Sequence, residues 1–472
     1  MAESLKKKTV KGVVWSALER FSAAGVNFII GLIIARLLSP KEYGIIAMLA
    51  VFMAISQSVI DSGFSNALVR KLNRSEIDYS TTFYFNIVVG ILMYVFLFLL
   101  APYIAKFYDT PELKNVTRVV GLTLIFGSCA IVQQSILTIR IDFKTPMLIS
   151  LISAFISGIV GIVMAANHYG VWALVGQMLS VAFLRTVLLW IIVKWKPQTG
   201  FSKASFKNLF GYGSKLLFAG ILETIYRNLY TIIIGKFFQS NTLGIYSRGE
   251  QIASYPASNI TGVIQRVTFP VLSNVQNDKE KLNNFFQQII KTTCFIVFPA
   301  MMLLIVVAAP LVDIVLTDKW SDCVPIIQIL SLSFMWYPVH ILNLNVLQVA
   351  GRSDWYLRIE LIKKIIGIIL LVVTTPLGVI MMCWGRVLYC FIELFINMYY
   401  SNQIIGITCK KQIQQYLPMF IHALIMGGVA LLGVSFIESN WNKIIVAFLF
   451  GFLYWFFIVK RTEKIELMQM FK

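Results

Sequence analysis

Long apolar stretches separated by short polar turns follow one another along almost the whole chain. Most reach about 20 residues, the length that an α-helix needs to cross the hydrocarbon core of a bilayer. We place spans near residues 12–37, 43–63, 82–105, 115–138, 146–166, 170–193, 209–236, 243–270, 285–307, 323–349, 355–375, 378–401, 416–436 and 440–460. The pattern therefore predicts an all-α integral membrane protein with about 14 transmembrane helices.

Basic residues in the loops predict the orientation of the spans. The loops on the side of both termini hold 22 lysines and arginines, and the alternate loops hold 7. Cytoplasmic loops of membrane proteins carry such an excess. We therefore expect a multi-pass protein with both termini in the cytoplasm. The longest loops have about 15 residues, which leaves no room for a catalytic domain outside the membrane.

Composition agrees with a membrane protein. Hydrophobic residues make up 58% of the 472 residues and charged residues 13%, with a net charge of +19. Soluble domains carry about twice that fraction of charge. The basic residues sit in loops and not in a soluble basic domain, so no nucleic-acid partner is predicted. The six cysteines lack CxxC spacing and the three histidines are scattered, so we expect no disulfide framework, no metal site and no cofactor.

An internal repeat divides the chain. Residues 33–45 (IIARLLSPKEYGI) and 233–245 (IIGKFFQSNTLGI) align without a gap at an offset of 200, and a weaker echo links the fourth span to the tenth. Because the repeat unit has six spans, an even number, its two copies should be related by an axis along the membrane normal. The predicted parts are an N-terminal lobe (1–195), a cytoplasmic linker (196–208), a C-terminal lobe (209–401) and two further spans with the tail (402–472).

Charged residues inside the spans are mostly basic. Four basic residues near span ends (Arg36, Lys236, Lys443 and Lys460) are counted with the loops, and twelve other lysines and arginines fall within the spans, against six acids. Arg20 shares one helix face with Ser16 and Asn27, because these residues are four and seven positions apart. Glu223 and Arg227 stand at i and i+4 near the middle of the seventh span, where they can pair. Two interpretations remain open for this pair: a salt bridge that locks helices together, or a cavity-facing pair whose arginine is released to an anion.

The eighth span is unusually polar for a membrane helix. Gln251, Tyr255, Asn259 and Arg266 fall on one stripe, and Pro256 interrupts the backbone hydrogen bonds between them. A polar helix survives in a membrane only beside protein or water. The stripe therefore indicates either the lining of a lumen or polar contacts between helices.

No catalytic signature is present in the sequence. It lacks a phosphate-binding GxxxxGK[ST] loop, an HExxH motif and a nucleophile elbow. We therefore predict that the protein is not an enzyme and does not hydrolyse ATP. The energy for any transport should come from an ion gradient, of protons or of sodium, or from the gradient of the substrate itself.

Three segments resemble bacterial polysaccharide exporters. They are ARLLSPKEYG, the downstream DSGF at Asp61 to Phe64, and LQVAGRSDWYLR at Leu347 to Arg358. The resemblance extends over essentially the whole chain. It is closest to the lipopolysaccharide and colanic-acid exporter branch of the Wzx-type flippases, within the multidrug/oligosaccharidyl-lipid/polysaccharide superfamily.

This resemblance implies an architecture and a function. The architecture is two six-helix lobes in a V around a central cavity, plus two C-terminal helices. The function is transfer of an undecaprenyl-pyrophosphate-linked oligosaccharide from the inner to the outer leaflet of the bacterial cytoplasmic membrane. Polymerases and glycosyltransferases of the same pathway would then be partners. By analogy with peptidoglycan-precursor flippases, the last two helices would hold the lipid tail.

Residues of the spans supply the candidate site. We expect substrate binding in a cationic cavity by Arg20, Arg227, Arg248, Arg266, Arg185, Lys215, Tyr255 and Asn259, with Glu223 as the coupling acid. Guanidinium groups suit phosphate oxygens because they donate two hydrogen bonds at once. A peptidoglycan-precursor flippase and a multidrug antiporter of the same fold are the alternatives, although the positive excess counts against an exporter of organic cations.

Overall fold

The computed structural model describes residues 25–462 except 62, 63, 72, 143, 199 and 277. Its contacts divide the chain into two compact units, one ending at Gly244 and the other beginning at Ile245. In the first unit an apolar helix, Gly25–Leu37, precedes α2 (Pro40–Asp61), α3 (Phe64–Arg70), α4 (Glu76–Phe107), α5 (Leu113–Val120), α6 (Leu122–Ile139), α7 (Lys144–Ala166), α8 (Val171–Val193), α9 (Lys203–Arg227) and α10 (Leu229–Phe237). The next helix, α11 (Ser240–Asn274), begins in the first unit and continues into the second.

The second unit continues with α12 (Lys279–Val315), α13 (Cys323–Met335), α14 (Tyr337–Val349), α15 (Ser353–Thr374), α16 (Val379–Ile405), α17 (Cys409–Ser435) and α18 (Asn440–Thr462). Two short 3₁₀ turns, Asp318–Trp320 and Thr375–Leu377, join α12 to α13 and α15 to α16. All regular elements of the described residues are therefore helical, and the predicted all-α class is confirmed.

The predicted spans coincide with these helices. Within the described residues, ten helical segments are long and apolar enough to cross a membrane. The other predicted spans fall on α9 with α10, on α11, on α15 and on the helix before α2. The first three carry more polar and charged residues, and the helix before α2 is described only from Gly25. The multi-pass membrane architecture is thus confirmed, while the count of fourteen stays a prediction.

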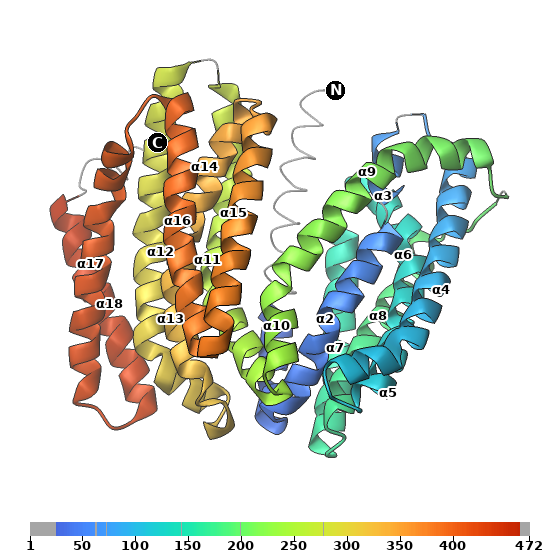
Figure 1. Ribbon diagram of the computed structural model, residues 1–472, viewed down its shortest axis with the longest axis horizontal. Helices are drawn as coiled ribbons and strands as arrows, with labels where there is room; N and C mark the ends of the chain where they lie inside the picture. The colour runs from blue at the N-terminus through green and yellow to red at the C-terminus, as the bar shows by residue number, and fades with distance from the viewer. Residues whose placement is uncertain are drawn as a thin grey trace. The chain divides into compact units, whose positions relative to one another are not determined.

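The same order of elements occurs in both halves of the chain. A long helix (α4, α12) is followed by a rod broken in two (α5–α6, α13–α14) and then by a pair of helices (α7–α8, α15–α16). The packing also corresponds: α6 contacts α4 and α8 in the first unit, and the α13–α14 rod contacts α12 and α16 in the second. The repeat inferred from a few residues at turns therefore extends to the arrangement of helices within each unit (Figure 1).

Two glycines lie where the start of α2 meets the start of α11. A Cβ atom on Gly44 would lie 1.7 Å from the carbonyl oxygen of Ser240, and one on Gly244 would lie 1.8 Å from that of Pro40. Because residues 40 and 44 match 240 and 244 at the repeat offset, the contact is reciprocal. Only residues without a side chain allow these two backbones to approach so closely.

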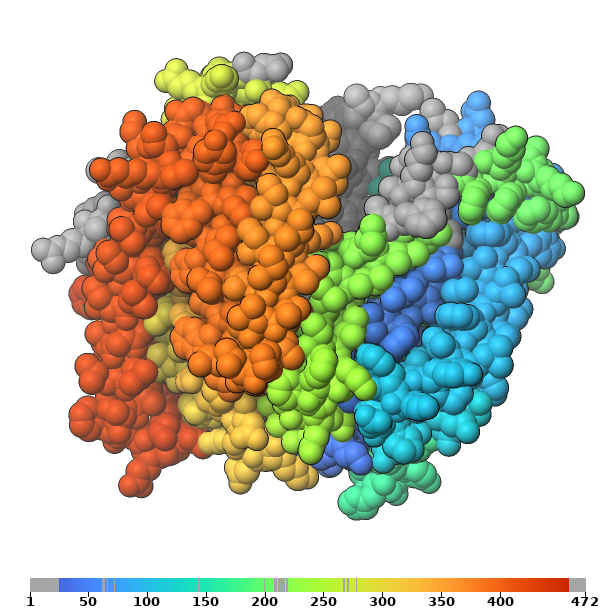
Figure 2. Space-filling model, in the orientation of Figure 1, coloured from blue at the N-terminus to red at the C-terminus, as the bar shows by residue number. Residues whose placement is uncertain are grey.

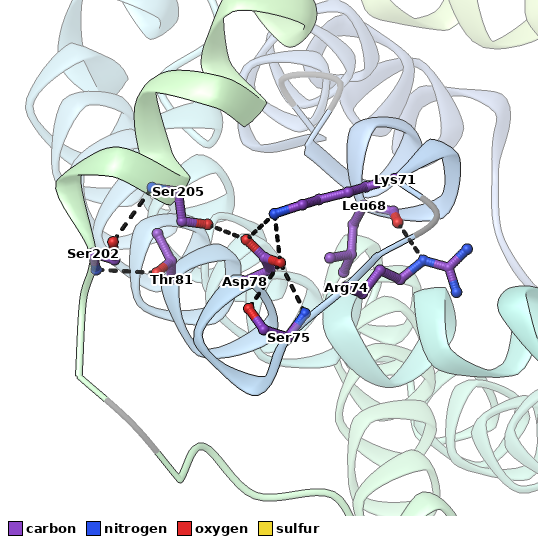
Figure 3. Close-up of polar contacts among 8 residues, drawn as sticks. All are labelled: Leu68, Lys71, Arg74, Ser75, Asp78, Thr81, Ser202 and Ser205. Carbon is purple, nitrogen blue, oxygen red and sulfur yellow. Dashed lines mark hydrogen bonds and ion pairs between the residues drawn. The ribbon is translucent and has the colours of Figure 1, made fainter.

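A buried aspartate fixes the beginning of α9 (Figure 3). The Asp78 carboxylate, whose residue is 1% exposed, accepts hydrogen bonds from Lys71 Nζ at 2.7 Å to each oxygen and from the Ser75 backbone N–H at 2.9 Å. Its Oδ1 also accepts a hydrogen bond from Ser205 Oγ at 2.5 Å, and the Ser202 N–H donates to Thr81 Oγ1 at 3.1 Å. These bonds join α4 to a helix more than 120 residues later in the sequence. The predicted linker 196–208 thus ends in a helix docked on the first unit.

The second unit is built around α12. Phe298, Trp336 and Tyr416 pack together in one core cluster of this unit. Both α17 and α18 contact α12, and Figure 1 shows them side by side at one edge of this unit. Small residues allow that approach: Gly427 faces Met302, and Gly451 faces Leu303.

Large apolar side chains cover the outside of α15 to α18. Among them are Ile365, Val372, Leu388, Leu432 and Phe457, each more than half exposed. Figure 2 shows these orange and red helices on the near face of the second unit. A soluble monomer rarely exposes an apolar surface of this extent. The surface is suited to contact with lipid tails, where no hydrogen bonds are required of the side chains.

The glycine contact gives the first prediction. In Gly44→Ala the added methyl group meets a backbone oxygen that cannot rotate away, so the starts of α2 and α11 must separate. We expect a loss of about 1–3 kcal/mol in stability, measured as a lower unfolding temperature of the purified protein in detergent. Gly428→Ala in α17 is the control, because nothing lies within 4 Å of its added Cβ. Equal stability of the two variants would contradict this explanation.

The Asp78 cluster gives the second prediction. Asp78→Asn keeps the shape of the side chain but leaves Lys71 without its charge partner, so we expect α9 to detach more readily at its first turn. Limited proteolysis of the segment 194–202 should become several-fold faster, and stability should fall by about 1–3 kcal/mol. The exposed helix cap Asp278, replaced by Asn, serves as the control. Unchanged proteolysis in Asp78→Asn would show that this cluster does not hold the linker.

Candidate functional site

The residues predicted to bind substrate belong to both units, and each unit is described by itself. Arg20 lies outside the described residues, as do the side chains of Lys215 and Arg266. Arg185 is exposed on α8. Their common role in a cavity stays a prediction.

Glu223 and Arg227 form the predicted ion pair on α9. Arg227 Nε donates to Glu223 Oε1 at 2.8 Å, and the side chains are 76% and 41% exposed for Arg227 and Glu223 respectively. The pair sits at the end of α9, because Asn228 separates α9 from α10. Next to it, Thr224 Oγ1 lies 3.2 Å from Ser58 Oγ on α2. The α9 helix is therefore held on α2 with the ion pair directed outward from the unit.

The three other described candidates lie on α11. Arg248 is 5% exposed, and its guanidinium donates to Gln251 Oε1 at 2.6 Å. Tyr255 and Asn259 are half-buried, and Asn259 Nδ2 donates to the Tyr255 carbonyl at 2.8 Å. The helix continues through Pro256. Arg248 is thus packed within the unit, while Tyr255 and Asn259 are partly accessible.

A cluster of buried charges in the second unit was not among the predicted site residues. Lys363, whose side chain is 4% exposed, lies between two carboxylates, 2.5 Å from Glu360 Oε1 and 2.8 Å from Glu393 Oε1. The i, i+3 spacing of Glu360 and Lys363 was a signal that they pair, but only the fold brings Glu393 to them from α16.

A second charge pair links α11 to α16. Arg386 pairs with Glu250 through Nη1, and the same nitrogen donates to Tyr246 Oη at 3.1 Å. Both charged side chains are largely buried. Opposite charges in contact reduce the free-energy cost of burying either one.

A polar cavity of about 370 Å³ lies at one end of the first unit. Its lining includes Lys41, Glu112, Asn115, Tyr169 and Trp172, from the beginnings of α2, α5 and α8 and the turn before α8. Lys41 Nζ lies 3.2 Å from Glu112 Oε1. By the loop charges this is the predicted outer end. Among the described residues no group of three or more metal-ligating side chains occurs.

Comparisons connect these features to known proteins. The chain is 25% identical over 331 residues to the lipopolysaccharide biosynthesis protein WzxC of Escherichia coli K12, covering 69% of this chain and 67% of that one. It is 23% identical over 449 residues to the teichuronic acid biosynthesis protein TuaB of Bacillus subtilis, and the match covers 93% of this chain and 91% of TuaB. The structure of the lipid II flippase MurJ in an inward closed conformation matches with a TM-score of 0.74 at 15% identity. The match covers 94% of this chain and 99% of MurJ. At this identity the structural likeness establishes the fold.

The family model described as polysaccharide biosynthesis protein matches residues 33–325, which is more than half of the chain. This match and the fold confirm the resemblance inferred from the sequence motifs. The fold is the one seen in the structure of the lipid II flippase MurJ. The chain therefore belongs to the polysaccharide biosynthesis protein family.

Proposed function

We propose that the protein moves an undecaprenyl-pyrophosphate-linked oligosaccharide from the inner to the outer leaflet of the bacterial cytoplasmic membrane. The transfer proceeds by alternating access of a cationic central cavity. Both termini lie in the cytoplasm, and the glycosyltransferases and the polymerase of the same pathway work before and after it. The lipid II flippase MurJ shares the fold, and the relatives WzxC and TuaB are a lipopolysaccharide and a teichuronic acid biosynthesis protein.

One observation carries this proposal. The Arg227 side chain is 76% exposed although it belongs to a predicted membrane span. An exposed guanidinium cannot face hydrocarbon without a penalty of about 2.5–3.5 kcal/mol or more. It must therefore face water or a bound anion. Two phosphate groups of a pyrophosphate supply acceptors for its remaining donors, and a water-poor surrounding strengthens those bonds.

Two other functions on this fold are the alternatives. A peptidoglycan-precursor flippase would use the same cationic chemistry, since its substrate also carries a pyrophosphate. A multidrug antiporter for organic cations would need acids in the cavity, and the embedded charges of this chain are mostly basic. A leaflet assay with purified protein in liposomes separates the three, if the liposomes contain defined lipid-linked oligosaccharides, a peptidoglycan precursor or a cationic dye.

The arginines give the third prediction. Arg20→Ala and Arg227→Ala should each reduce export about tenfold or more, because a hydrogen bond to a charged group contributes about 1.5–3 kcal/mol. Export by Arg227→Lys should lie between that of the unaltered protein and that of Arg227→Ala, since lysine keeps the charge and loses the bidentate geometry. Export is measured at equal surface expression. Arg118→Ala is the control, because that guanidinium lies 4.1 Å from the centre of the Phe98 ring. Export unchanged in both Arg20→Ala and Arg227→Ala would remove the cavity proposal.

Glu223 gives the fourth prediction, which concerns the energy source. When pyrophosphate takes over Arg227, Glu223 loses that counter-charge and can accept a proton. Glu223→Gln should therefore abolish the dependence of export on the proton gradient. Glu112→Gln, which removes an exposed carboxylate paired with Lys41, is the matched control. A Glu223→Gln variant that exports at full rate with undiminished gradient dependence would show that Glu223 is not the coupling acid. A sodium gradient, or consumption of the flipped lipid, would then be the driving force.

A further inference from the structure

The cavity at the end of the first unit has no part in the proposed substrate site, because none of its lining residues is among the candidates. It is lined by the beginnings of α2, α5 and α8, which contact one another. Its volume of about 370 Å³ lies within the range of about 300–1,000 Å³ that small-molecule sites occupy. Three of the lining residues, Ile45, Val116 and Val171, are buried and apolar. The cavity can therefore hold a small ligand that has both apolar and polar faces.

Two aromatic rings line this cavity. Tyr169 is 59% exposed and Trp172 is 37% exposed. Neither the Tyr169 hydroxyl nor the Trp172 indole N–H has a hydrogen-bond partner among the described residues. Exposed tyrosine and tryptophan often anchor a protein at the membrane surface. These two instead line a concave site, where a ring offers a flat apolar face to a ligand.

Hydrogen-bonding groups stand beside the rings. Glu42 Oε2 accepts hydrogen bonds from the Ser39 backbone N–H at 2.9 Å and from the Ser39 hydroxyl. This capping arrangement at the start of α2 fixes the carboxylate and leaves Oε1 for another donor. A Cβ atom on Gly170 would lie 3.7 Å from that Oε1. The exposed Asn115 amide adds a further acceptor and two donors.

The charges of the lining favour a neutral ligand over an anion. Lys41 and Glu112 pair with each other at 3.2 Å. The carboxylate of Glu42 is the remaining charge among the lining residues. It would repel a phosphate group, whereas hydroxyl groups can donate hydrogen bonds to its oxygens.

The turn before α8 holds both rings in place. Gly170 has a φ of +57°, a conformation that favours glycine. The Tyr169 N–H donates to the Met164 carbonyl at 3.1 Å, and the Ala173 N–H donates to the Gly170 carbonyl at 3.1 Å. Because the backbone on both sides of the rings is fixed, a ligand pays little ordering entropy when it binds.

The second copy of the internal repeat lacks these groups. The turn before α8 recurs before α16 at an offset of 208, again with a glycine of positive φ followed by a valine that begins the helix. There Leu377 and Ile380 replace the two aromatic residues, and Thr242 replaces Glu42 at the start of α11. A role in holding the turn would apply to both copies. The aromatic and carboxylate groups of the first copy therefore indicate a ligand.

A pyranose sugar has the faces that this cavity matches, since C–H groups cover its ring and hydroxyl groups surround its edge. We infer that the cavity binds one pyranose unit, whose C–H face packs on Trp172 or Tyr169 and whose hydroxyl groups bond to Glu42 and Asn115. The inference rests on the proposed function only for the source of the sugar. At the predicted outer end, the occupant would be part of the lipid-linked oligosaccharide after transfer. A free glycan outside the membrane is the other source of the same chemistry.

Saturation-transfer NMR on the whole protein in lipid nanodiscs tests the site without transport. The probes are the methyl glycosides of glucose, galactose and N-acetylglucosamine, and inorganic pyrophosphate is the anionic competitor. We expect transfer from the protein to the ring protons of at least one glycoside, with no effect of pyrophosphate. Absence of transfer to all three glycosides, or loss of transfer when pyrophosphate is added, would overturn the inference.

Variants locate the bound sugar. Trp172→Ala and Glu42→Gln should each weaken glycoside binding about tenfold, whereas Trp172→Phe keeps a ring and should retain most of the binding. Glutamine also serves the capping arrangement, so the unfolding temperature of Glu42→Gln should stay unchanged. Trp441→Ala is the matched control, because Trp441 is 65% exposed at the beginning of α18, another predicted outer boundary. Binding by Trp172→Ala equal to that of Trp441→Ala would reduce Trp172 to a membrane anchor and overturn the assignment.

Flipping in liposomes identifies the source of the sugar. An excess of the bound glycoside on the outer side should slow flipping of a lipid-linked oligosaccharide, and Trp172→Ala should remove this effect. A glycoside that binds without slowing flipping would assign the saccharide site to a free glycan. If the unaltered protein flips no lipid-linked oligosaccharide, the proposed function fails while the binding result still stands. If it flips the lipid but binds no glycoside, only the inference of this site fails.

Discussion

The free-energy cost of placing a polar or charged group in hydrocarbon governs this structure. Each backbone group in a span must be satisfied within the chain, which restricts the spans to helices. Each embedded charge needs an opposite charge or water, because an isolated one costs at least several kcal/mol. The described ion pairs meet this requirement in two ways. Lys363 is enclosed by two carboxylates, whereas Arg227 has one carboxylate and an exposed remainder.

The internal repeat explains how the same helical plan is used twice. The close contact of Gly44 with Ser240, and of Gly244 with Pro40, links corresponding residues of the two copies in a reciprocal way. Such a contact allows no side chain on either glycine, so the turn sequence is constrained in both copies at once. This constraint explains why the repeat is clearest at 33–45 and 233–245, while the apolar spans have diverged. Lipid-facing positions accept many apolar residues, and a backbone contact accepts only glycine.

The helices were predictable from the sequence because the length of an apolar stretch can be read from neighbouring residues alone. Within the described residues, the predicted spans fall on one helix or on two helices in line, and the family motifs led to the correct family. The breaks within three of these spans were not predicted. No proline or glycine signals the break at Asn228, whereas Gly121 stands at the break between α5 and α6 and Pro338 follows the one between α13 and α14. The i, i+4 pair of Glu223 and Arg227 was also predictable, because its spacing lies on one helix face.

Contacts between distant segments could not be predicted in the same way. Asp78 and Ser205 are 127 residues apart, and nothing in either segment indicates the other. The burial of Arg248 and the enclosure of Lys363 depend in the same way on helices that arrive later in the chain. For this reason the sequence identified which charges are embedded, but not which of them are permanently neutralised. Only the fold separates the two groups.

That separation bears on how a transporter of this family can use its charges. A guanidinium with one partner and a large exposed surface can exchange that partner for a ligand anion, because its other donors are already in a polar environment. An ammonium enclosed between two carboxylates cannot be exchanged without uncovering two negative charges. It instead joins α15 to α16 through Glu393. The two kinds of ion pair therefore differ in burial, and they lie in different helices: α9 in the first unit, and α15 and α16 in the second.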